Sequence, residues 1–153
     1  MAHKVGDIMT PEVITIDVDA GLDEAQALMD AEDVRRLPVV DEDGDLVGIL
    51  SWGDLREATS VEAAQTPSPY APDAEDEWLT VWEAMTHDPL VVTRDTELVD
   101  VVEMMLENKI AGLPVVESQT GPGRRRLTGI VTESDIFRLL IRLWRDEAQH
   151  AAD

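Results

Sequence analysis

The heptapeptide GILSWGD at residues 48–54 has a close copy, GIVTESD, at residues 129–135. Each heptapeptide follows the same tetrapeptide, LPVV, which occurs at residues 37–40 and again at 113–116. The spacing grows from 76 residues (113 − 37) to 81 residues (129 − 48), so the second copy has five extra residues between these landmarks. A repeat of this size is too small to close a core alone. We therefore expect the two copies to bury their apolar faces against each other and to form two related clefts.

The dipeptide Met-Thr opens each copy, at residues 9–10 and 85–86. With these starts, the pattern predicts a first repeat at 1–58 and a second repeat at 78–148. Residues 59–77 between them contain three prolines followed by an acidic run, a composition typical of an exposed linker.

Apolar periodicity predicts the order strand, helix, strand, strand, helix in each copy, and therefore an α/β fold. In the first copy these elements are expected at residues 13–16, 22–31, 37–40, 46–50 and 51–58. In the second copy they are expected at residues 90–92, 98–106, 113–116, 127–131 and 132–148. The acidic turn between the hairpin strands of the first copy contains Gly44, which can adopt the positive φ that such a turn needs.

The composition excludes several classes of protein. The chain has no cysteine, which excludes disulfides, thiol catalysis and thiolate metal sites and fits a reducing cytoplasm, where we expect the protein to be located. The first residues lack the apolar segment of a signal peptide. The longest apolar stretch near the end of the chain is interrupted by Arg138 and Arg142, so no membrane span is expected.

The formal net charge is −21, from 33 carboxylates and 12 basic residues. Such an acidic surface repels nucleic-acid phosphates and anionic lipids, so we expect neither nucleic acid nor membrane as a partner. Lys4 and Lys109 are the only lysines. Acidity with few lysines is typical of proteins from a high-salt cytoplasm, and an ordinary acidic protein is the alternative.

Each heptapeptide contains the pattern Ser/Thr-x-x-Asp, formed by Ser51 with Asp54 and by Thr132 with Asp135. Before an apolar helix this pattern is a capping box, which satisfies free backbone N–H groups and needs no ligand. A helix N-terminus also offers donors and a positive dipole, where a hydroxyl and a carboxylate can hold a nucleotide. Because a capping box does not require the preceding glycine, duplication of the whole string favours a functional role.

The tandem βαββα units, the Met-Thr starts, the LPVV strands and the Gly-x-x-Ser/Thr-x-x-Asp endings resemble a pair of CBS domains, the arrangement called a Bateman module. The resemblance covers nearly the whole chain apart from the linker and the last residues. It implies two repeats packed about a pseudo-twofold axis, with two clefts that bind AMP, ADP, ATP or S-adenosylmethionine.

The resemblance also implies roles for individual residues. Asp54 and Asp135 would each hold ribose hydroxyls, with Ser51 and Thr132 beside the ribose or the phosphate. The adenine slots would be lined near four places in the sequence: the backbone at Ile14 and Thr15, the residues before Pro38, the backbone at Leu90 and Val91, and the residues before Pro114.

The two copies differ just before the LPVV strands. Arg35 and Arg36 precede the first strand, whereas Ala111 and Gly112 precede the second. Basic residues at this place are typical of family members that bind phosphorylated adenosines, and arginine suits bidentate phosphate contacts. Alternatively, the two arginines only offset the C-terminal end of a helix and the surrounding acids. The pattern thus predicts one phosphate-binding site and one that is empty or suited to a less charged adenosine.

No nucleophile–base pattern or Walker-type phosphate loop is present, so we expect a regulatory module and not an enzyme. His3, His87 and His150 have no metal-ligand spacing, so no metal site is expected. The alternative function is a structural dimerisation module with empty clefts. In either case a signal would pass to a separate effector protein or act through self-association.

A homodimer is expected, as the resemblance implies. The last predicted helix has more apolar side chains than one side of a small domain needs: Ile136, Leu139, Leu140, Leu143 and Trp144. The alternative is that these residues complete the core of their own chain.

Overall fold

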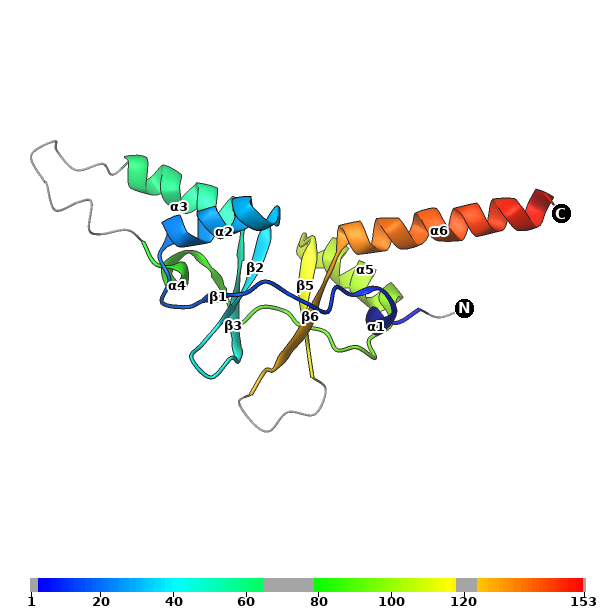
Figure 1. The fold of residues 1–153 in the computed structure, drawn as a ribbon, viewed down its shortest axis with the longest axis horizontal. Helices are drawn as coiled ribbons and strands as arrows, with labels where there is room; N and C mark the ends of the chain where they lie inside the picture. Colours follow the sequence, from blue (N-terminus) through cyan, green and yellow to red (C-terminus); the bar gives the residue numbers. More distant parts are fainter. Residues whose placement is uncertain (1–2, 65–78, 118–123, 153) are drawn as a thin grey trace, which may run out of the picture. The chain divides into compact units, whose positions relative to one another are not determined.

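The computed structural model of the 153-residue chain describes residues 3–64, 79–117 and 124–152 (Figure 1). None of the helices in these ranges is long and apolar enough to cross a membrane.

The chain divides into two compact units, and each unit combines one repeat with the segment that opens the other repeat. Residues 14–89 form the unit that contains Asp54, here called the Asp54 unit. Residues 1–13 and 90–153 form the unit that contains Asp135, here called the Asp135 unit.

In the described residues of the Asp54 unit, a four-stranded sheet packs against helices. Its elements are β1 (Ile16–Asp17), α2 (Leu22–Glu32), β2 (Arg36–Val40), β3 (Leu46–Ser51), α3 (Trp52–Ala64), α4 (Val81–Ala84) and β4 (Thr86–His87). The strand order is β1-β2-β3-β4, in which β1 runs parallel to β2 and the other neighbours are antiparallel. Helices α2 and α3 contact each other and the two central strands, as expected for one apolar face covered by one helical layer.

The Asp135 unit repeats this plan with less regular outer strands. Its elements are α1 (Val5–Ile8), α5 (Leu98–Asn108), β5 (Gly112–Val116), β6 (Leu127–Thr132) and α6 (Glu133–Ala152). Val92 forms a parallel bridge to Val115, and Thr10 forms an antiparallel bridge to Ile130. These bridges occupy the positions that β1 and β4 have in the Asp54 unit.

Most elements predicted from the sequence are confirmed within one or two residues, including both hairpins, α2 and α5. The first outer strand is shorter than predicted, since β1 has only two residues and its counterpart is the single bridge at Val92. Gly44 has the expected positive φ, 83°. The last helix ends at Ala152, four residues beyond the predicted end at Ala148.

The compact units differ from the repeats expected at 1–58 and 78–148, which keep each opening segment with the repeat that follows it. Helix α3 also continues to Ala64, so the expected linker at 59–77 begins inside a helix. The remaining residues of the expected linker, 65–77, lie outside the described residues.

Each opening segment completes the core of the unit it enters. Val81 and Val5 are fully buried, one in each core. The Val81 N–H donates to the Ala20 carbonyl at 2.8 Å, and the Val5 N–H donates to the Thr96 carbonyl at 2.9 Å. The two units therefore match in backbone hydrogen bonds as well as in element order.

Gly48 lies on β3 and Gly129 on β6, where an opening segment runs antiparallel beside the strand. A Cβ atom at Gly48 would lie 2.8 Å from the Thr86 carbonyl oxygen, and a Cβ at Gly129 would lie 2.7 Å from the Thr10 carbonyl oxygen. Backbone so close leaves no room for a side chain. Packing therefore explains the glycine of each heptapeptide. From the sequence we expected its duplication to favour a functional role, and this argument no longer holds.

The apolar residues of α6 divide between the core and the surface. Leu139 is part of the Asp135-unit core, and Ile136 packs against it. Leu140 is half-buried, whereas Leu143 and Trp144 are exposed, Trp144 by 62%. Ile136 and Leu139 thus pack into the core of their own unit, which is the alternative considered for this helix, whereas Leu143 and Trp144 remain exposed.

Candidate functional site

In the Asp54 unit, the start of α3 forms a reciprocal capping box. The Ser51 N–H donates to Asp54 Oδ2 at 3.0 Å, and the Asp54 N–H donates to Ser51 Oγ at 3.0 Å. Both side chains are half-buried. The capping role considered for this motif is thus present in the structure, and Asp54 Oδ1 keeps acceptor capacity for further hydrogen bonds.

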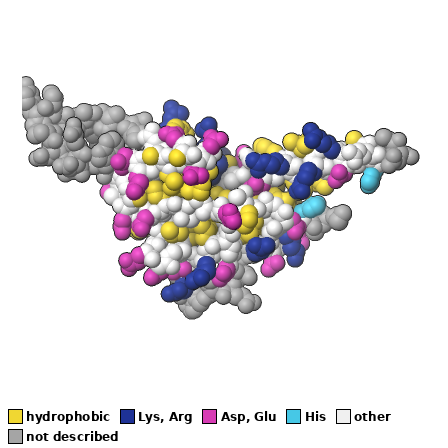
Figure 2. Space-filling view, viewed as in Figure 1, with side chains coloured by type: hydrophobic (Ala, Val, Ile, Leu, Met, Phe, Trp, Pro, Cys, Tyr) yellow, Lys and Arg dark blue, Asp and Glu magenta, His cyan; other side chains and the backbone are white. Residues whose placement is uncertain are grey.

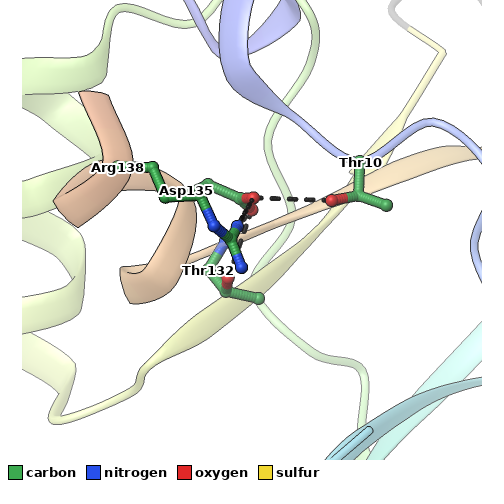
Figure 3. Close-up of polar contacts among 4 residues, drawn as sticks. All are labelled: Thr10, Thr132, Asp135 and Arg138. Atoms are coloured by element: carbon green, nitrogen blue, oxygen red, sulfur yellow. Dashed lines mark hydrogen bonds and ion pairs between the residues drawn. The ribbon is translucent and has the colours of Figure 1, made fainter. Parts of the chain in front are cut away.

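In the Asp135 unit, the equivalent carboxylate accepts more hydrogen bonds (Figure 3). Asp135 Oδ2 accepts from the Thr132 N–H at 2.9 Å and from the Thr132 hydroxyl at 3.1 Å. Asp135 Oδ1 accepts from Arg138 Nη1 at 3.2 Å and from the Thr10 hydroxyl at 3.4 Å, a long hydrogen bond. Since a carboxylate has about four lone-pair sites, these donors occupy nearly all of them. Asp135 is also buried, with 7% of its side chain exposed.

The strand that precedes each motif lies directly beside it. In the Asp54 unit, Arg36 is paired in register with Ser51, and the Trp52 N–H donates to the Arg35 carbonyl at 2.8 Å. The structure therefore brings both predicted phosphate-binding arginines to the start of α3, with the Arg35 side chain exposed and that of Arg36 half-buried.

The same backbone arrangement in the Asp135 unit lacks basic side chains. Gly112 is paired with Thr132, and the Glu133 N–H donates to the Ala111 carbonyl at 3.0 Å. The predicted difference between the two copies is thus located at equivalent places beside the two carboxylates.

The remaining predicted residues lie on the outer strands or inside the sheets. Ile14 and Thr15 are half-buried just before β1, and Ile14 packs against the core. Leu90 is 45% exposed and Val91 is half-buried, in the corresponding place of the other unit.

Pro38 and Pro114 are buried inside β2 and β5, where they pair with Ile49 and Ile130. Their side chains belong to the interior of the units. This agrees with a role for the backbone before them, and not for the proline rings, in lining a slot.

Sequence reasoning missed Thr10 and Arg138 as site residues. The Met-Thr dipeptide was recognised only as a landmark, and its hydroxyl reaches a carboxylate 125 positions away. The Arg138 side chain is 72% exposed and is paired with Asp135. Its spacing of three residues from Asp135 on a helix is the signal that predicts this contact.

Three carboxylates also gather in the β2–β3 turn. Side-chain oxygens of Asp41, Asp43 and Asp45 lie within 4.8 Å of one another. Asp41 Oδ1 accepts from the N–H groups of Asp43 and Asp45, both at 3.0 Å. Because these bonds account for the position of Asp41, the turn itself explains the cluster.

Comparison with known proteins identifies both repeats. Residues 5–60 and 81–142 each match the CBS domain family. A CBS domain-containing protein of Dictyostelium discoideum is 33% identical over 149 residues, which is 94% of each chain. Some further relatives are enzymes, such as the homoserine O-acetyltransferase of Methanococcoides burtonii, which is 32% identical over 90% of this chain and 24% of its own length.

Two solved structures carry adenosine ligands. CBSX2, a protein of Arabidopsis thaliana, was solved in complex with AMP; it is 31% identical, with a TM-score of 0.74 over 92% of this chain and 98% of its own. The CBS domain pair of protein MJ0100 was solved with 5′-methylthioadenosine and S-adenosyl-L-methionine. It is 30% identical, with a TM-score of 0.73 over 92% of this chain and 97% of its own. The chain described above has the same α/β fold as these CBS pairs.

Proposed function

The chain belongs to the CBS-domain family, and we propose that it is a non-catalytic regulatory module that binds an adenosine nucleotide. The observation that carries this proposal is the equivalent placement of Asp54 and Asp135, each at the start of a helix and beside an LPVV strand. The AMP complex of CBSX2 and the S-adenosyl-L-methionine complex of the MJ0100 pair support adenosine compounds as the ligand class.

The hydrogen bonds at Asp54 leave it able to bind the hydroxyls of a sugar. A carboxylate accepts hydrogen bonds from two neighbouring hydroxyls, which is the arrangement on a ribose. Asp54 has acceptor capacity left for both hydroxyls, since its described hydrogen bond uses Oδ2 only. Arg35 and Arg36 lie beside it and supply the positive charge that a phosphate needs.

Isothermal titration calorimetry with AMP, ATP and S-adenosylmethionine tests the proposal. We expect Asp54→Ala to weaken binding at its site by about 2–3 kcal/mol, because two charge-assisted hydrogen bonds are lost. Glu24→Ala, which removes an exposed carboxylate on α2, is the control and leaves the affinity unchanged. No heat at millimolar ligand would refute nucleotide binding and favour a structural module with empty clefts. Product formation in a chromatographic assay would refute the non-catalytic part.

We also propose that the module associates into a homodimer through α5 and α6. An apolar groove of about 280 Å³ runs between these helices in the Asp135 unit. Val99 and Val102 line it from α5, and the two helices carry further exposed apolar side chains: Leu106, Phe137, Ile141, Leu143 and Trp144.

The charges of the two helices favour a second copy as the occupant of this groove. Helix α5 carries exposed acidic residues at Asp100, Glu103 and Glu107, whereas α6 carries the exposed Arg145. A twofold axis that sets α6 of one copy against α5 of the other would pair opposite charges around an apolar centre.

Light scattering tests this association. We expect a mass twice the 16.9 kDa of one chain for the wild type and for Ala27→Asp, an exposed substitution on α2. Leu140→Asp and Trp144→Asp are expected to yield monomer. Because Trp144 is exposed, its substitution leaves the core of the unit intact. A wild-type mass near 17 kDa at micromolar concentration would exclude the dimer.

Composition and charge support a proposed location and a proposed class of partner. The absence of cysteine fits the cytoplasm, and the strong acidity disfavours nucleic acid and anionic membranes as partners. A ligand-dependent change in shape or association would then act on a separate effector protein.

A further inference from the structure

A depression of about 560 Å³ lies beside Asp135, within the Asp135 unit. Its lining comes from α1 and α6: Asp7, Ile8, Asp135, Arg138, Ile141 and Arg142. Asp135, the carboxylate proposed to hold a ribose, thus lines the same depression as two guanidinium groups.

Two guanidinium groups in the lining of this depression can pair with an anion. Arg138 and Arg142 are exposed and four residues apart, so they lie on one face of α6, about 6 Å apart along its axis. Figure 2 shows Lys and Arg side chains gathered along this helix. Of the two acids in the lining, Asp7 accepts from the Lys4 N–H at 3.0 Å, and Asp135 is buried under its four donors.

The Asp54 unit has the opposite arrangement of charge. Arg35 and Arg36 precede its LPVV strand, while the position three residues after Asp54 is Glu57. In the Asp135 unit the residues before the strand are uncharged, and the position three residues after the carboxylate is Arg138. The basic residues near the carboxylate therefore precede the strand in the Asp54 unit and lie on the helix in the Asp135 unit.

We propose that Arg138 and Arg142 bind the phosphate of an adenosine nucleotide whose ribose is held by Asp135. This inference rests on the nucleotide-binding function proposed above. Ribose hydroxyls replace the Arg138 and Thr10 donors on Asp135 Oδ1, and the released Arg138 guanidinium pairs with the phosphate. Arg142 lies one helical turn further along and provides the second cation.

The exchange has a physical basis. The contact between Asp135 and Arg138 involves a side chain that is 72% exposed, so solvent screens it and its loss costs little. A dianionic phosphate between two guanidiniums replaces one such contact with several charge-assisted hydrogen bonds. The Asp135 site is then a phosphate site, although Ala111 and Gly112 beside it supply no charge.

Calorimetry in an Asp54→Ala background isolates the Asp135 site, with AMP and adenosine as probes at constant ionic strength. We expect Arg138→Gln and Arg142→Gln each to weaken AMP about tenfold while changing adenosine less than about twofold. Arg126→Gln, an exposed arginine just before β6 and outside the depression, is the control and should bind both probes like the background.

The outcomes separate this inference from the proposed function. Equal effects on AMP and adenosine, or no effect on either, overturn the inference. Loss of all binding in the Asp54→Ala background, with binding retained in the wild type, also overturns it while the Asp54 site and the proposed function stand. A wild type that binds neither probe overturns both.

Discussion

Asp54 and Asp135 occupy equivalent positions on two backbones that match in their hydrogen bonds, yet their carboxylates have different surroundings. Asp54 shares a reciprocal capping box with Ser51. Asp135 is buried and receives donors from Thr132, Arg138 and Thr10. The contrast shows that a duplicated backbone preserves where a carboxylate lies, whereas the side chains around it decide how much acceptor capacity remains for a ligand.

The largest expected effect tests the backbone packing that the Asp54 and Asp135 units have in common. We expect Gly48→Ala and Gly129→Ala each to lower the free energy of unfolding by about 3 kcal/mol. The reason is that the new Cβ would collide with a backbone carbonyl oxygen of the neighbouring opening segment. Urea denaturation measures the change. Gly53→Ala, which has room for a Cβ in the first turn of α3, is the control and should be neutral or slightly stabilising. A large loss of stability for only one of the two variants would show that the backbone packing at Gly48 and at Gly129 is not equivalent.

The second prediction concerns the two carboxylates themselves. Asp135→Ala should cost about 2–3 kcal/mol of stability in the absence of ligand, since it leaves several donors without their acceptor. Asp54→Ala should cost about 1 kcal/mol, the usual value for a lost capping residue. Both values are accessible from denaturation curves with a common slope. Equal costs would mean that the extra donors on Asp135 contribute nothing measurable.

The smallest expected effect isolates the contact that crosses the sequence. Thr10→Val removes the hydroxyl 3.4 Å from Asp135 Oδ1 and should lower stability by about 0.5 kcal/mol, because the bond is long and Thr10 is exposed. Thr86→Val is the matched substitution in the Asp54 unit and should change stability less. A cost above that of Asp54→Ala would contradict the view of Thr10 as a minor donor.

Local patterns in the sequence predicted much of this molecule correctly. The hairpins around Pro38 and Pro114 and helices α2 and α5 were located from apolar periodicity and turn residues, which act over a few positions. The Ser51–Asp54 motif was also predictable, since its two residues lie three apart and meet wherever a helix begins. The end of α3 was not, because the expected stop near Ala58 rested on the linker composition that follows.

The site beside Asp135 was predicted less well. Arg138 meets Asp135 through helical spacing, which a closer reading of the sequence would have indicated. Thr10 meets the same carboxylate through an opening segment that belongs to the other repeat, and no local pattern predicts that contact.

The sequence by itself determined the duplication, the α/β order and the two Ser/Thr-x-x-Asp helix starts, because each depends on neighbouring residues and on repeated spacing. Only the tertiary structure decided which opening segment completes which core, why Gly48 and Gly129 must lack side chains, and how fully Asp135 is hydrogen-bonded. The physical reason is that these features arise from close approach between segments far apart in the chain. Their energy depends on packing distances of a few ångströms, which composition and periodicity do not specify.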